Sequence, residues 1–261
     1  MLLVFGMQHA KEILQAAFLG ILQGATEFLP VSSSGHLVIA QHFLPDVAKQ
    51  PVTLDIILHL GTLFALCIYF FKDLKNMLFA PKIAMPLVVA TLATVMVAFP
   101  FRHYIESAFS SPQLASLILI FTGLLLFIAA KVKRNYRQSV GIRDAIYIGL
   151  SQALATLPGV SRSGTTIAFG IYLGLKGETS CRFSFLMAIP AIFGAGLLEL
   201  KGISSVPHTL FLPYLVGFIC SFLIGLWAIK FLLKMLIKSQ KKLSYFAYYC
   251  WVTGLVFFWL I

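Results

Sequence analysis

Six long apolar stretches constrain this chain more than any other feature, because each is long enough to cross a lipid bilayer. An α-helix needs about 20 apolar residues to pass through roughly 30 Å of hydrocarbon. The stretches lie at residues 54–71, 84–100, 113–130, 182–200, 211–230 and 244–261. Only 11% of the 261 residues are charged, whereas soluble domains carry about 25%. We therefore expect an all-α polytopic membrane helical bundle that forms a single integral membrane domain over residues 1–261.

Two further apolar regions, 10–45 and 144–175, are each interrupted by Pro, Gly and a polar cluster. The first interruption reads Pro30-Val31-Ser32-Ser33-Ser34-Gly35-His36 and the second reads Pro158-Gly159-Val160-Ser161-Arg162-Ser163-Gly164. Pro and Gly commonly end helices, so each half of these regions is expected to be too short to span the bilayer comfortably. We interpret both regions as re-entrant helical hairpins that accompany the six full spans.

Lysine and arginine gather in the connections that follow the first, third and fifth spans. They are Lys72, Lys75 and Lys82, then Lys131, Lys133, Arg134, Arg137 and Arg143, then Lys230, Lys234, Lys238, Lys241 and Lys242. Basic loops usually stay in the cytoplasm, so hairpin 144–175 is expected to enter from the cytoplasmic face and hairpin 10–45 from the outer face. Lys11 and Lys49 flank the outer hairpin and oppose this assignment. The same distribution explains the net charge of +11 without nucleic acid as a partner.

The two interrupted regions also resemble each other when the sequence is shifted by 129 residues. The matching pairs are Gly20 and Gly149, Gln23 and Gln152, Val31 and Val160, Ser32 and Ser161, Ser34 and Ser163, and Gly35 and Gly164. This offset predicts repeat halves at about 10–130 and 140–261. Hairpins that enter from opposite faces give the repeats an inverted topology, which places a binding site near the membrane midplane.

Glu27 is the most unusual residue of the first hairpin, because a carboxylate inside an apolar run costs about 2.5 kcal/mol or more to insert. Gln23 lies one helical turn earlier and therefore on the same face. A hydrogen bond that packs two helices is one interpretation of this pair. The functional interpretation is a carboxylate that binds a cation or moves a proton.

Each interruption opens a new helix with hydroxyl groups, and the first free amides of a helix are well suited to bind phosphate. Helix capping explains one serine of the first cluster, but not three serines followed by His36, whose side chain exchanges protons near neutral pH. Arg162 needs an anionic partner at membrane depth, and Glu27 is expected to serve while no substrate is bound. Two such helix starts that face each other, one with Arg162 and the other with His36 and Glu27, match a diphosphate group in size and charge. Asp55 and His59 either support this site or lie at the membrane interface.

Two motifs resemble the undecaprenyl-diphosphate phosphatase family of the bacitracin-resistance type. Residues 23–36, from Gln23 to His36, are similar to its (E/Q)xxxE segment and the Ser-rich segment that follows. Residues 158–166, from Pro158 to Thr166, are similar to its PGxSRSxxT segment. Gln23 stands where many members have Glu, which leaves Glu27 as the only carboxylate of the pair.

The resemblance implies an enzyme of the bacterial cytoplasmic membrane that removes the terminal phosphate of undecaprenyl diphosphate and so recycles the lipid carrier of cell-wall synthesis. It implies a divalent cation, Mg²⁺ or Ca²⁺, with Glu27 as the metal ligand. It assigns catalysis to Glu27, Ser33, His36 and Arg162. The substrate-binding residues are then Gln23, Ser32, Ser34, Ser161, Ser163, Gly164, Thr165 and Thr166. The expected partners are the prenyl diphosphate lipid and membrane lipids, with a homodimer left open.

Two questions stay open at the level of sequence. The nucleophile is Ser33, His36 or a water molecule. A membrane transporter or flippase for an anionic or prenyl-phosphate substrate shares the inverted repeats, broken helices and midplane charges, so it remains the alternative function. A purely structural membrane protein leaves the paired polar interruptions unexplained.

Overall fold

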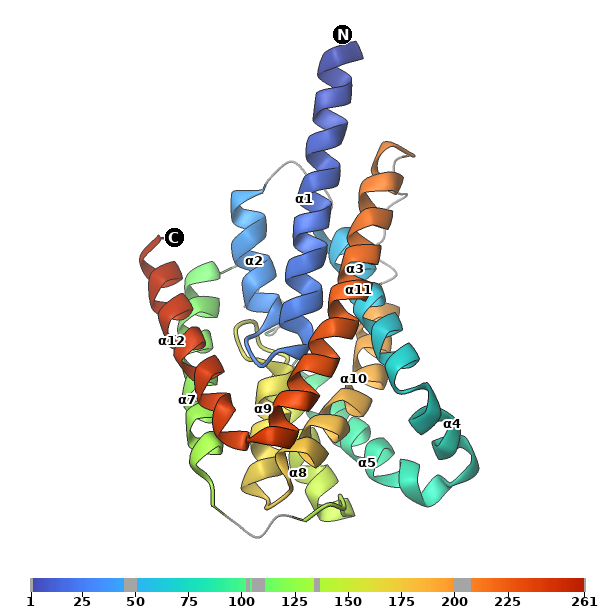
Figure 1. Cartoon of the computed structure of the whole chain (residues 1–261), viewed down its shortest axis with the longest axis vertical. Helices are drawn as coiled ribbons and strands as arrows, with labels where there is room; N and C mark the ends of the chain where they lie inside the picture. Colours follow the sequence, from blue (N-terminus) through green and yellow to red (C-terminus); the bar gives the residue numbers. More distant parts are fainter. Residues whose placement is uncertain are drawn as a thin grey trace.

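The computed structural model describes residues 2–44, 51–101, 104, 111–133, 137–199 and 208–260, and in this part of the chain it is a helical bundle without strands (Figure 1). The elements of the first half are α1 (Leu2–Phe28), α2 (Ser33–Phe43), α3 (Pro51–Tyr69), α4 (Phe71–Phe79), α5 (Pro81–Ala98) and α7 (Pro112–Lys131). Those of the second half are α8 (Ile142–Leu154), α9 (Arg162–Tyr172), α10 (Gly177–Glu199), α11 (His208–Lys238), a short 3₁₀ helix η2 (Gln240–Lys242) and α12 (Leu243–Leu260). Lys49, Arg134 and the last residues of two predicted spans, 200 and 261, lie outside the described residues.

The predicted polytopic all-α bundle is confirmed. Five helices in the described part are long and apolar enough to cross a membrane, and α3 together with α4 makes a sixth candidate that is bent by 67°. The bend differs from the straight span expected over 54–71. It occurs at Phe70, which is fully buried and packs edge-on against Phe185 of α10, with ring centroids 6.3 Å apart. Beyond it, the polar helix α4 is held by an ion pair of 2.9 Å from Arg182 to Asp73.

Both interrupted regions form helix–break–helix units, as expected. Helices α1 and α2 flank the first break, and α8 and α9 flank the second. Figure 1 shows α1 and α2 toward the end that carries the N-terminus, α8 and α9 toward the opposite end, and the two breaks near the middle. The inverted repeat, its two halves and the single domain stay predictions.

Helix α1 corrects one expectation, because it is not a short half-helix. It begins at Leu2 and runs for 27 residues, which is about 40 Å at 1.5 Å per residue. Among the described helices, however, α1 is not one of those apolar enough to be a candidate membrane span. Its sequence from Leu2 to Phe28 contains no proline, so nothing interrupts the helix before the break. The expectation had placed the start of this region at about residue 10.

Small residues let α1, α3 and α11 approach closely, and this contact fixes the end of α1. A Cβ atom at Gly24 would lie 2.6 Å from the carbonyl oxygen of Ser221, and one at Gly61 would lie 2.7 Å from that of Phe218. Ser221 also donates a hydrogen bond of 2.7 Å to the carbonyl of Leu58. Close backbone approach through small residues is a main source of helix association in membranes. The last turn of α1, which carries Glu27, is therefore held rigidly.

Helix α7 supports the second break through one hydroxyl group. Thr122 donates to the carbonyl of Gly159 over 3.0 Å and accepts from the amide of Ser161 over 3.1 Å. Gly159 has a φ of 91°, a conformation that residues with a side chain rarely adopt. A Cβ there would also clash with the carbonyl of Ala115. The glycine at this position therefore lets the break lie against α7.

A bidentate ion pair holds the start of α8 in place. Arg137 donates to both carboxylate oxygens of Asp144 over 2.8 Å, and these hydrogen bonds lower the pKa of Asp144. The carboxylate also accepts from the amide of Gly141 over 2.9 Å. Because the pKa is lowered on folding, this contribution to stability is lost only as the pH falls through the folded-state value.

Candidate active site

Glu27 lies at the centre of a polar cluster between the two breaks. One of its oxygens, Oε1, accepts from the guanidinium of Arg162 over 2.6 Å. The other, Oε2, accepts from the hydroxyl of Ser33 over 2.6 Å and from the amide of Gln23 over 3.1 Å. The Glu27 residue is only 7% exposed. The sequence-based expectation that Arg162 and Glu27 would meet is thus met in the structure, across 135 positions of the chain.

The matching serines of the two breaks form the same local structure. Ser32 caps α2 by accepting from the amide of Gly35 over 3.3 Å, and Ser161 caps α9 by accepting from the amide of Gly164 over 3.1 Å. In each break the capping hydroxyl also lies close to a second serine hydroxyl, with 3.4 Å between Ser32 and Ser34. The corresponding distance between Ser161 and Ser163 is 3.3 Å. The repeated residues therefore build two similar helix starts.

The two helix starts are in direct contact. Ser163 donates a hydrogen bond of 3.2 Å to the carbonyl of Leu29 in the first break. A Cβ at Gly35 would lie 3.3 Å from the Cα of Gly159, and one at Gly164 would lie 3.3 Å from the Cβ of Pro30. Ser32 takes a φ of 67° to make this turn, and such strain persists only where the surroundings impose it. Ser33 follows immediately and reaches Glu27.

His36 belongs to the same helix start, but its side chain bonds to groups other than Glu27. Its Nδ1 lies 2.7 Å from the carbonyl of Ser32, and its Nε2 lies 2.9 Å from the hydroxyl of Tyr249 on α12. The two rings are stacked, with centroids 5.7 Å apart. Because a carbonyl only accepts hydrogen bonds, Nδ1 carries a proton, and in the neutral ring Nε2 accepts from Tyr249. The structure thus brings Glu27, Ser33 and Arg162 together and turns the His36 ring toward α12.

The remaining substrate-binding candidates line the start of α9. Thr166 donates to the carbonyl of Arg162 over 2.8 Å and shares a hydrogen bond of 2.6 Å with the hydroxyl of Ser184 on α10. The Nη1 of Arg162 lies 3.5 Å from the carbonyl of Ser184. The Thr165 hydroxyl is buried without a partner. Thr166 therefore positions the first turn of α9, whereas the Thr165 hydroxyl has no hydrogen-bond partner in the described residues.

Three neighbours of the cluster were not assigned to it from the sequence. His59 of α3 places its Nε2 3.7 Å from Oε2 of Glu27, and its side chain is 34% exposed. The open question about Asp55 and His59 is therefore answered for His59, while the Asp55 carboxylate accepts from Gln41 over 2.6 Å. Ser184 and Tyr249 are the other two. The segment Phe183-Ser184-Phe185 also resembles the phosphatase family, but that resemblance gave Ser184 no role, and Tyr249 carried no sequence signal.

The oxygen atoms around Glu27 are compatible with one divalent cation. No group of three or more His, Cys, Asp or Glu side chains that could hold a metal occurs in the described residues. However, the Oε1 of Gln23 is buried without a hydrogen-bond partner, one turn from Glu27. Mg²⁺ is often bound by one or two carboxylates together with substrate phosphates. A carboxylate, an amide oxygen and the Ser33 hydroxyl fit a cation that is shared with a phosphate group.

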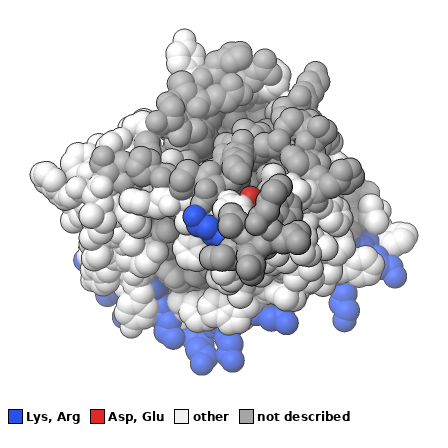
Figure 2. Space-filling view, turned by 90° about the horizontal axis from the view of Figure 1, so that it is seen from above, with Lys and Arg blue, Asp and Glu red and all other residues white. Residues whose placement is uncertain are grey.

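Charge is distributed unevenly over the surface. Seen from the end that carries the N-terminus, the molecule shows mostly uncharged residues, with Lys and Arg along one edge of the view (Figure 2). Basic and acidic side-chain atoms are also visible near the centre of this face.

Comparison with known proteins places the chain in a family. The family model described as bacitracin resistance protein BacA matches residues 16–256. An undecaprenyl-diphosphatase of Syntrophotalea carbinolica is 41% identical, over 94% of this chain and 97% of its own length. An undecaprenyl-diphosphatase of Halothermothrix orenii is 38% identical, over 94% and 96%, and one of Methanobrevibacter smithii is 35% identical, over 95% and 97%. The chain therefore belongs to the bacitracin resistance protein BacA family.

Proposed function

We propose that this protein hydrolyses undecaprenyl diphosphate to undecaprenyl phosphate and inorganic phosphate. It is a multi-pass enzyme of the bacterial cytoplasmic membrane, and the reaction recycles the lipid carrier for cell-wall synthesis. The observation that carries the proposal is the cluster of Glu27, Ser33 and Arg162 at the contact of two polar helix starts. Relatives that match nearly the whole chain carry the name undecaprenyl-diphosphatase.

Arg162 binds the diphosphate in this proposal. Its guanidinium is paired with Glu27 and is only 15% exposed, so phosphate oxygens that enter the site compete with the carboxylate for it. A planar guanidinium binds two phosphate oxygens at once. The first amides of α2 and α9 have no partner inside their helices and add hydrogen bonds to the same group. Together they stabilise the negative charge that develops on the transferred phosphoryl group.

Ser33 is the nucleophile that the geometry favours. Its hydroxyl already donates to Glu27 over 2.6 Å, whereas His36 is held between Ser32 and Tyr249. The Ser33 oxygen bonds to the terminal phosphorus and its proton passes to Glu27. Undecaprenyl phosphate leaves with the bridging oxygen and takes that proton from Glu27, so the carboxylate is free again. Water then attacks the phosphoserine, Glu27 takes a proton of that water, and inorganic phosphate is released with the Ser33 hydroxyl restored.

A divalent cation, Mg²⁺ or Ca²⁺, is part of the proposal. Glu27, Gln23 and Ser33 would hold it together with phosphate oxygens, and it would neutralise phosphate charge that a single arginine does not balance. The homodimer and the absence of a nucleic-acid partner stay predictions.

Purified protein in detergent should release phosphate from undecaprenyl diphosphate, because hydrolysis needs no separate compartments. A chelator should abolish release, and added Mg²⁺ or Ca²⁺ should restore it. The Glu27→Gln variant serves as the control for a contaminating phosphatase. A transporter or flippase without enzymatic activity gives no phosphate in this assay, and that result would contradict the proposed function. Activity that survives the chelator would contradict the cation alone.

Substituting Ser33 by alanine tests the nucleophile. We expect phosphate release to fall by at least about 100-fold, within the range that positioned proton-transfer partners contribute, because both the attacking oxygen and its hydrogen bond to Glu27 are removed. Ser34→Ala is the matched control, since the Ser34 hydroxyl lies 3.4 Å from the Ser32 hydroxyl and has no hydrogen bond to Glu27 in the described residues, so this variant should lose much less. Brief incubation with substrate labelled at the terminal phosphate should label Ser33. Near-normal turnover of Ser33→Ala would eliminate Ser33 as the nucleophile.

A further inference from the structure

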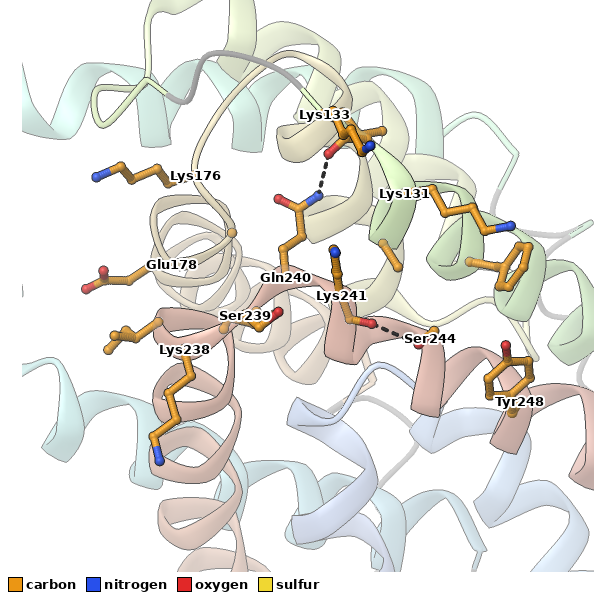
Figure 3. A pocket seen from close by; sticks show the side chains of 16 residues that line it. Lys131, Lys133, Lys176, Glu178, Lys238, Ser239, Gln240, Lys241, Ser244 and Tyr248 are labelled. Carbon is orange, nitrogen blue, oxygen red and sulfur yellow. Dashed lines mark hydrogen bonds between the residues drawn. The ribbon is translucent and has the colours of Figure 1, made fainter.

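A polar cavity lies beside the lysine-rich connections that follow α7 and α11, apart from the cluster around Glu27. It has a volume of about 910 Å³ and is lined by the end of α7, the start of α10, the end of α11, η2 and the start of α12 (Figure 3). Cavities of roughly 300–1,000 Å³ are the size that holds small-molecule ligands. The residues around Glu27 do not line it, so the proposed hydrolysis leaves its purpose unexplained.

The lining of this cavity is strongly basic. Five lysines and a single acidic residue, Glu178, contribute to it. Lys241 lies beside Gln240 and Lys133 lies above the Gln240 amide in the view, whereas the other lysines extend outward (Figure 3). These are Lys131, Lys176 and Lys238. None of the five forms an ion pair with a carboxylate of the described residues, so the cavity presents positive charge to a ligand.

Hydrogen bonds hold the centre of the cavity in place. The side-chain amide of Gln240 donates to the carbonyl of Ala129 over 2.6 Å and to that of Val132 over 3.3 Å, at the end of α7. Ser244 donates to the carbonyl of Lys241 over 2.8 Å. The Oε1 of Gln240 is buried without a partner, so an acceptor is left available for a hydroxyl group of a ligand. The cavity is therefore formed before any ligand arrives.

One side of the cavity is apolar and lies at the surface of the bundle. Phe127 and Ile237 line it, and Ile237 is 60% exposed on the bundle surface. Tyr248, which is also exposed, packs edge-on against Phe127 with ring centroids 6.1 Å apart. Lys131 places its Nζ 3.9 Å from the centroid of the Phe127 ring. Aromatic residues beside lysines are typical of the level of the lipid headgroups.

We propose that this cavity binds the headgroup of an anionic phospholipid from the cytoplasmic leaflet. Its phosphate lies between Lys133 and Lys241, a headgroup hydroxyl donates to the Oε1 of Gln240, and the acyl chains leave beside Phe127 and Ile237. Basic pockets between membrane helices on this side of the bilayer have the chemistry that anionic headgroups need. A soluble phosphate would use the lysines but not the apolar side, which is why the lipid is favoured.

The test measures phosphatidylglycerol bound to the full-length protein by native mass spectrometry, with phosphatidylcholine as the neutral reference. A lysine near the membrane surface strengthens binding of anionic lipid about fivefold. The double variant Lys133→Gln/Lys241→Gln should therefore bind phosphatidylglycerol at least about tenfold more weakly. Lys72→Gln/Lys75→Gln is the matched control, because it removes the same charge from exposed positions of α4 outside the cavity, and its affinity should stay near that of the wild type.

Phosphate release from undecaprenyl diphosphate should stay near the wild-type rate in both double variants, which shows that they are folded. Inorganic phosphate at millimolar concentration should not displace the lipid. Equal loss of phosphatidylglycerol in both variants would mean that general surface charge binds it, and unchanged binding in the first variant would mean that the cavity does not. Displacement by inorganic phosphate would make the ligand a free phosphate. Each of these three results would overturn the proposal.

Discussion

Replacing Arg162 by alanine is expected to slow phosphate release by at least about 100-fold, the scale of losing one donor that stabilises a transition state. Arg162 is the cation that contacts Glu27 between the two breaks, so its loss removes charge from the place where the diphosphate binds. The rate constant kcat should fall along with kcat/KM, because phosphoryl charge is greatest in the transition state. Steady-state phosphate release by the purified variant is the measurement.

Two further variants sharpen this prediction. Arg162→Lys keeps the charge but not the planar fork, so it should recover only part of the activity. Arg182→Ala is the matched control, because Arg182 of α10 also forms an ion pair of 2.9 Å, with Asp73 of α4 and not with Glu27. Its activity should stay within a few-fold of the wild type. An Arg162→Ala enzyme as active as the Arg182→Ala enzyme would remove Arg162 from the mechanism.

Substituting Glu27 by glutamine should lower kcat by about 10²–10⁴-fold, the contribution of a positioned general base. The amide keeps the size of the side chain but accepts no proton from Ser33. Binding of the required cation should weaken as well, because Glu27 is the carboxylate proposed to hold it and the described residues offer no group of three or more His, Cys, Asp or Glu side chains for a metal. Measuring the Mg²⁺ concentration for half-maximal activity separates this effect from the loss of the base.

The same substitution leaves Arg162 buried without its carboxylate, and breaking a buried ion pair costs about 3–5 kcal/mol. We expect Glu27→Gln to lower the thermal unfolding temperature in detergent. The double variant Glu27→Gln/Arg162→Ala should be more stable than Glu27→Gln alone and equally inactive. Recovery of activity in the double variant would show that Glu27 acts on stability and not on chemistry.

The sequence was sufficient to predict the spans and the central ion pair, because the physics behind both is severe. A bilayer sets the length of an apolar helix, so each of the six predicted spans contains a described helix. An arginine at membrane depth requires an anion, and Glu27 was the buried carboxylate that could provide it. The free energies involved, of inserting an apolar helix and of burying an unpaired arginine, are large. Weaker effects therefore do not reverse either prediction.

The neighbours of the cluster were harder to predict because their signals are weak. Tyr249 lies in an apolar span, where an aromatic residue usually faces lipid, yet its hydroxyl reaches His36 over 2.9 Å. The bend at Phe70 depends on packing against α10, and no proline marks it. Contacts between helices that are distant in sequence decide such details, and an apolar pattern does not specify them.

The offset of 129 residues shows which residues of the candidate site match between the two interrupted regions and which differ. Matching serines cap both helix starts in the same way. The residues that the offset aligns with Glu27 and Ser33 are Thr156 and Arg162, so the chemistry arises where the two halves differ. Gln152, which matches Gln23, bonds to Thr94 instead of a carboxylate. The matching residues therefore build two similar helix starts. The proposed base, nucleophile and arginine lie at positions where the two regions differ.

The most direct test of this arrangement is a cryo-electron microscopy structure with a prenyl methylene-diphosphonate, a substrate analogue whose P–C–P linkage does not hydrolyse. We expect the diphosphonate to lie between the starts of α2 and α9, with its oxygens about 3 Å from the guanidinium of Arg162. The Ser33 hydroxyl should lie about 3–3.5 Å from the terminal phosphorus. A diphosphonate bound elsewhere, with Arg162 still paired to Glu27, would contradict the account.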